Sequence, residues 1–89
     1  MKLQEAQAIL RDETESCSTK IQAGWTIADS PESSLENLLE CLSYRGQIAE
    51  AAAIALYKRT NRPRASEELS AFVVSPEDWR NYLQGIGAM

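Results

Sequence analysis

Apolar and small residues recur at helical spacing through the middle of the chain. Between Ser30 and Asn61 they form one stripe of residues three or four positions apart, namely Leu35, Leu38, Leu42, Gly46, Ala49, Ala53 and Leu56. A neighbouring stripe consists of Cys41, Ile48, Ala52 and Ala55. Such spacing places side chains on one side of an α-helix. The pattern predicts one helix over residues 31–60 that other elements must cover on two sides.

The ends of this predicted helix carry recognisable signals. Ser30 can accept a hydrogen bond from a free backbone N–H of the first turn, and Pro31 suits the first helical position. Ser33 and Glu36 form an alternative capping box. Asn61 tolerates the left-handed conformation in which many helices end.

Gly46 lies within the first apolar stripe of the central helix. We interpret it as a point where a neighbouring helix approaches closely. A kink is the alternative, because glycine costs a helix interior roughly 1 kcal/mol relative to alanine.

The N-terminal part of the chain shows a similar pattern. One face holds Leu3, Ala6, Leu10, Thr14, Cys17, Ile21, Gly24 and Ala28. This register predicts a single helix over residues 3–28. The alternative is a break near Thr14–Ser18, since serine and threonine are weak helix formers. A short connection at residues 29–31 makes the two long helices antiparallel neighbours.

A third helix is predicted near the C-terminus, over residues 76–84. Ser75 and Pro76 start it, and Trp79, Tyr82 and Leu83 lie on one side. The expected fold class is therefore all-α: a long antiparallel two-helix hairpin plus a short C-terminal helix, in one domain of 89 residues.

The second stripe of the central helix also predicts self-association. A chain of this length buries a modest fraction of its surface when it folds alone. A two-fold dimer would cover Cys41, Ile48, Ala52 and Ala55 and create a four-helix core. The alternative is that the C-terminal segment of the same chain covers this stripe.

Composition and net charge indicate where the protein is located and which partners it can bind. The net charge is −4, which disfavours non-specific binding to nucleic acid by the molecule as a whole. No apolar run approaches the ~20 residues that span a bilayer, and the N-terminus does not resemble a signal peptide. We expect a cytoplasmic protein that does not enter the membrane.

The residues that several kinds of catalytic and binding site need are absent from the sequence. The chain has no histidine, so nucleophile–histidine pairs are excluded. Two distant cysteines cannot complete a zinc site, and no glycine-rich nucleotide-binding loop occurs. We predict that the protein is not an enzyme and uses neither a metal nor a cofactor.

Cys17 and Cys41 lie at equal distances from Asp29, on either side of the predicted turn. In an antiparallel hairpin they reach nearly the same level, which makes them a candidate redox pair. Cytosolic proteins usually keep their thiols reduced, so two free thiols are the alternative.

Two groups of residues are candidates for binding a partner. The basic turn contains Lys58, Arg59, Arg62 and Arg64, and the C-terminal helix carries Trp79 and Tyr82. Cations in the last turn of a helix also occur simply to complement its dipole, and aromatic residues also fill small cores. We expect Arg62 and Arg64 to be exposed, so that alanine at both positions leaves the fold nearly intact.

The resulting hypothesis is a small non-enzymatic protein-interaction module, either an adaptor, a regulator or a subunit of an assembly. Its partner is a protein, with a homodimer included. The alternative is a nucleic-acid-associated regulator that uses the basic turn over residues 58–64.

Overall fold

The computed structural model of the chain describes residues 1–44, 46–63 and 75–88. Every regular element within these residues is an α-helix, which confirms the all-α class. The five helices are α1 (Leu3–Arg11), α2 (Cys17–Asp29), α3 (Leu35–Leu42), α4 (Gln47–Thr60) and α5 (Pro76–Gly85).

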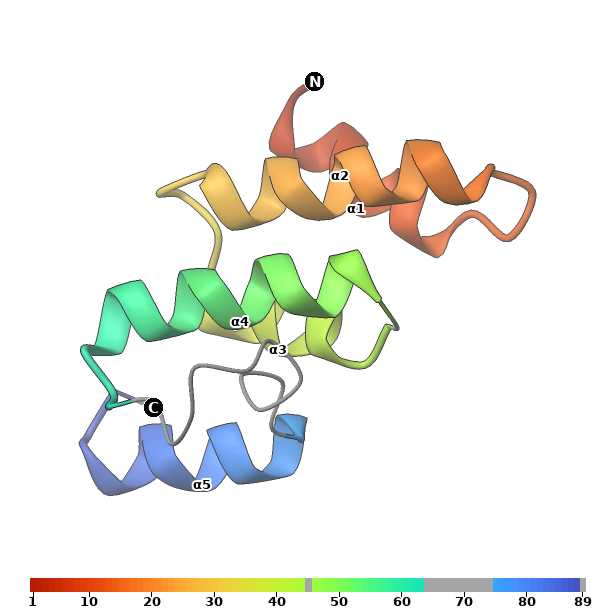
Figure 1. Cartoon of the computed structure of the whole chain (residues 1–89). Helices are drawn as coiled ribbons and strands as arrows, with labels where there is room; N and C mark the ends of the chain where they lie inside the picture. The colour runs from red at the N-terminus through yellow and green to blue at the C-terminus, as the bar shows by residue number, and fades with distance from the viewer. Residues whose placement is uncertain (45, 64–74, 89) are drawn as a thin grey trace.

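The helices form three layers (Figure 1). Helices α1 and α2 pack together as one hairpin, and α3 and α4 pack together as a second. The hairpins meet through α2 and α4, and α5 packs on α3 at the opposite side. The predicted pair of long helices is thus replaced by two stacked short hairpins with a fifth helix.

The prediction of one helix over residues 3–28 is wrong, and the alternative break is confirmed. Helix α1 ends at Arg11, where the carboxylate of Asp12 accepts hydrogen bonds from the backbone N–H and the hydroxyl of Thr14 (2.9 and 2.6 Å). Ser16 then caps α2 by accepting from the N–H of Thr19. These polar side chains satisfy backbone groups outside a helix, which explains the interruption.

The single helix predicted over residues 31–60 is also wrong. It divides into α3 and α4 near Gly46, whose φ of +67° lies in a region that favours glycine. A Cβ added at Gly46 would meet no atom within 4 Å, so the glycine does not serve a close helix approach. Its role is to turn the chain between the two helices.

The start of α3 lies at Leu35, four residues later than the predicted start. The side chain of Ser34 caps it by accepting from the N–H of Asn37 (3.1 Å). Ser33 is buried instead, and its hydroxyl donates to the carbonyl of Ile27 in the last turns of α2 (2.6 Å). Because the Ser33 hydroxyl is engaged with Ile27, the neighbouring Ser34 caps the helix.

Two predicted helix ends are confirmed. Helix α4 ends at Thr60, and Asn61 adopts the left-handed conformation, with φ 54° and ψ 26°. Helix α5 begins at Pro76 behind the capping side chain of Ser75, which accepts from the N–H of Asp78 (3.1 Å). It ends at Gly85, one residue beyond the prediction.

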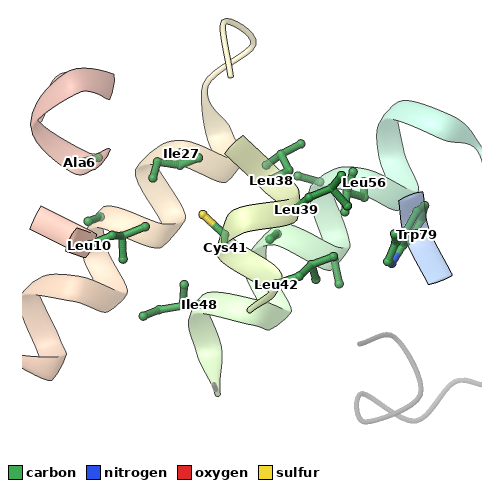
Figure 2. Close-up of a cluster of buried hydrophobic side chains, with 14 of the residues drawn as sticks. Ala6, Leu10, Ile27, Leu38, Leu39, Cys41, Leu42, Ile48, Leu56 and Trp79 are labelled. Carbon is green, nitrogen blue, oxygen red and sulfur yellow. The ribbon is translucent and has the colours of Figure 1, made fainter. Parts of the chain in front are cut away.

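The core runs from the first hairpin through the second to α5 (Figure 2). Leu38 and Leu56 are fully buried, as the main stripe predicted. The second stripe is buried too, within this chain: Cys41, Ile48, Ala52 and Ala55 all belong to the core. One copy of the chain thus supplies cover that the dimer was predicted to provide, and part of it comes from α2. The alternative cover by the C-terminal segment concerns residues 64–74, which lie outside the described residues.

Helices α2 and α4 run in the same direction, because residues near both N-termini line one hollow and residues near both C-termini line another. A Cβ added at Gly24 would lie 3.1 Å from a side-chain atom of Ile48. Gly24 is therefore the glycine that permits close helix approach in this fold.

Candidate interaction surface

The predicted basic turn is largely engaged by the protein itself. Arg59 donates to the backbone carbonyls of Ser30 (2.8 Å) and Ser33, which ties the end of α4 to the connection between α2 and α3. Lys58 is exposed, and Arg64 lies outside the described residues. The turn therefore does not present a continuous cationic surface within the described part of the chain.

Arg62 is packed into an aromatic cluster. Its guanidinium carbon lies 4.7 Å from the ring centre of Trp79 and 4.5 Å from that of Tyr82. It also pairs with the carboxylate of Asp78 at 3.0 Å. The expectation that Arg62 is an exposed charge is wrong, because α5 brings two rings and a carboxylate onto it.

Trp79 is fully buried, and Tyr82 is half-buried. The Trp79 ring makes edge-on contacts with Tyr57 and Tyr82, at centroid distances of 4.9 and 5.8 Å. Its Nε1–H and one Nη group of Arg62 are buried without an acceptor among the described residues. This placement assigns Trp79 to the packing between α4 and α5, not to a surface.

Two ion pairs join α3 to its neighbours. Glu36 receives two hydrogen bonds from Arg80 of α5 (2.7 and 3.2 Å), and Glu40 receives two from Arg11 of α1 (3.0 and 2.9 Å). The hydrogen bonds from these guanidinium groups hold the pKa of each carboxyl below its usual value. The carboxylates therefore connect helices and do not gather into a cation site.

The two cysteines occupy different environments, and both are free thiols. Cys17 is exposed at the first residue of α2, whereas Cys41 is buried in α3 among Ile27, Leu38 and Ile48 (Figure 2). Burial raises the pKa of the Cys41 thiol to about 11. Because the thiolate is the reactive form, Cys41 is poorly suited to rapid redox exchange.

Helix α2 carries an exposed aromatic residue, Trp25, and its first turns line an apolar hollow together with the start of α4. Trp25 is 37% exposed; of the described large apolar residues, only Met1 and Ile86, near the chain ends, are more exposed. The hollow has a volume of about 490 Å³. Its lining includes Cys17, Lys20 and Ile21 from α2, with Tyr44, Gln47 and Ile48 from the other hairpin.

A smaller hollow of about 190 Å³ lies at the other end of the same two helices. Asp29, Lys58 and Arg59 contribute to its lining. Because its lining carries charged residues, the larger and mainly apolar hollow is the better receptor for an apolar side chain.

The described residues contain no group of histidine, cysteine, aspartate or glutamate side chains that could hold a metal ion. Within the same residues, no helix is long and apolar enough to cross a membrane. Comparison with models of known protein families, with curated proteins and with solved structures finds no match. The candidate surface therefore rests on geometry alone.

Sequence reasoning missed the large hollow, because Ile21 and Ile48 were assigned to buried stripes of two unbroken helices. The signal that could have located it is the glycine at position 46 after Ser43 and Tyr44, which marks a turn. A turn there brings Tyr44 and Gln47 beside the first residues of α2.

Proposed function

We propose that this protein is a small non-enzymatic interaction module whose binding surface is the α2–α4 face. The observation that carries the proposal is Trp25, an exposed tryptophan one helical turn along α2 from Ile21, which lines an apolar hollow. Tryptophan is enriched among the residues that dominate binding energy at protein interfaces. This surface replaces Trp79 and Tyr82 as the principal binding site, because those rings pack inside the protein.

The chemistry of the face favours a protein partner. The lining of the hollow is mainly apolar, with polar groups from Lys20 and Gln47 at hand. An apolar centre with a few polar neighbours is the usual anatomy of a protein interface. A fully exposed aromatic side chain offers about 150–250 Å² of surface, and the exposed 37% of Trp25 is the part that a partner can remove from water.

Quantitative affinity capture from the native host tests this proposal. The wild-type chain is compared with Trp25→Glu and with the control Gln84→Glu, which adds a negative charge at an exposed position of α5, away from this face. A partner that binds wild type and the control but not Trp25→Glu supports the surface. Equal recovery with all three baits would show that the binding surface lies elsewhere.

The nucleic-acid alternative has less support from the geometry. The guanidinium groups of Arg59 and Arg62 already contact carbonyls, a carboxylate and aromatic rings, although Arg59, like Lys58, is exposed. Phosphate binding by several cations produces strong salt dependence. Retention on heparin or RNA that weakens steeply with salt would restore this alternative.

Self-association and a cytoplasmic location, both expected from the sequence, remain part of this proposal. The dimer no longer draws support from the second stripe of the central helix, which is buried within one chain. Any dimer must use the surface that remains exposed after the hairpins have packed.

A further inference from the structure

We propose that α5 is a salt-sensitive latch, a helix that leaves the α3–α4 hairpin as one unit while α1 to α4 stay folded. The surface of α3 and α4 that α5 covers is then exposed only in this open state. The inference concerns a different surface from the α2–α4 face, so it does not depend on the proposed function.

Helix α5 lies at the edge of the fold, on the side of the second hairpin away from α1 and α2 (Figure 1). Two of its residues one helical turn apart, Trp79 and Leu83, are fully buried, while Gln84 is exposed. The Trp79 ring packs edge-on against Tyr57 of α4 at 4.9 Å. An edge element that is held along one side can open as a cooperative unit and leave the rest of the core intact.

Two ion pairs fasten this helix to the hairpin. Arg80 donates two hydrogen bonds to the carboxylate of Glu36 in α3 (2.7 and 3.2 Å). Asp78 accepts one from Arg62, which follows the end of α4 (3.0 Å). Because Glu36, Arg80 and Asp78 are exposed, dissolved ions can screen both pairs. Docking of α5 should therefore weaken as the salt concentration rises.

Two buried donors make the docked state less stable than its apolar contacts alone would make it. Nε1–H of Trp79 and one Nη group of Arg62 have no acceptor among the described residues. Water supplies acceptors to both groups when α5 opens, whereas docking removes that water. Burial of Trp79 and Leu83 keeps the helix docked most of the time, and the unpaired donors narrow the free-energy gap to the open state.

Native-state hydrogen exchange of the full chain in low concentrations of urea tests the proposal. Urea carries no charge, so salt can be varied separately. The amides of residues 79–85 are expected to exchange through one shared opening, at least tenfold more frequent than the opening that exposes the amides of α2 and α4. This opening should become more frequent with urea, because it exposes buried surface. Simple fraying would instead give amide-by-amide exchange that is nearly independent of urea.

Two arginine variants test how the latch is fastened. Arg80→Ala should make the opening up to about fivefold more frequent, as expected for the loss of an exposed ion pair. It should also reduce the increase in opening that about 1 M NaCl produces by screening. Arg11→Ala is the matched control, because Arg11 donates two hydrogen bonds to Glu40 of the same α3 but belongs to α1. Exchange of residues 79–85 should be unchanged in this control.

Each outcome decides one part of the proposal. If residues 79–85 exchange only when the whole chain unfolds, or only by fraying, the latch is overturned. An opening that responds neither to salt nor to Arg80→Ala, or that responds equally to Arg11→Ala, overturns its fastening by the ion pairs. None of these measurements involves Trp25, so their failure is distinct from a failure of the proposed function.

Discussion

Replacement of Arg62 by alanine should destabilise the fold, although sequence reasoning placed this side chain at the surface. The side chain is 21% exposed and contacts Trp79, Tyr82 and Asp78. A cation over an aromatic ring contributes about 0.5–1 kcal/mol at partly exposed sites, and an ion pair of this kind about 0.2–1 kcal/mol. The contacts of Arg62 with two rings and one carboxylate together should therefore contribute about 1–3 kcal/mol to the free energy of unfolding.

This loss is large enough to measure by thermal unfolding. For a chain of this size, 1 kcal/mol corresponds to about 4–8 °C in the midpoint, so Arg62→Ala should lower it by roughly 5–20 °C. Circular dichroism follows the helices, and in a Trp25→Phe background the fluorescence of Trp79 reports whether water reaches the buried indole. Arg62→Lys should recover part of the loss, since it keeps the charge but not the planar stacking.

Arg80→Ala is the matched control, because Arg80 also pairs with a carboxylate but is exposed and contacts no aromatic ring among the described residues. Its midpoint should fall less than that of Arg62→Ala. Equal midpoints for the two variants would refute the claim that Arg62 is held by the aromatic cluster. The exposed charge predicted from the sequence would then describe the molecule better.

Two further predictions follow from burial. Leu38→Ala should lower the free energy of unfolding by about 2–5 kcal/mol, the usual range for emptying a fully buried leucine site. If its denaturant midpoint were no lower than that of Gln47→Ala, at an exposed position, this prediction would be wrong. Cys41 should resist alkylation at pH 8 in the native state, whereas exposed Cys17 should react. A pKa of about 11 leaves about a thousandth of the Cys41 thiol as thiolate, and burial blocks access to it. Mass spectrometry of the labelled peptides distinguishes the two cysteines, and comparable labelling of both would show that Cys41 is not sealed in the core.

Local signals in the sequence predicted the helical class and several element ends. Asn61 and Ser75 act as predicted because capping depends on a few neighbouring residues. The main apolar stripe also identified Leu38 and Leu56 as core residues, since helical periodicity persists on both sides of a break. The break between α3 and α4 preserves this register, so the pattern alone does not reveal it.

The hairpin arrangement could not be predicted from periodicity alone. An apolar stripe continues across a break when both helices contribute to one core, so the pattern does not distinguish one long helix from two short ones. The deciding signals were the polar side chains around Asp12 and the conformational freedom of Gly46. The α2–α4 surface depends on this non-local folding, and its hollow was therefore invisible in the sequence.

The division of the chain into two short hairpins also bears on how fast it can fold. Each hairpin joins helices that are separated by a few residues, so its contacts form without closing a long loop. Arg59 of α4 then donates hydrogen bonds to the connection between α2 and α3, which links the second hairpin to the first. Chains rich in such local contacts fold in microseconds to milliseconds, and we expect this chain to fold on that timescale.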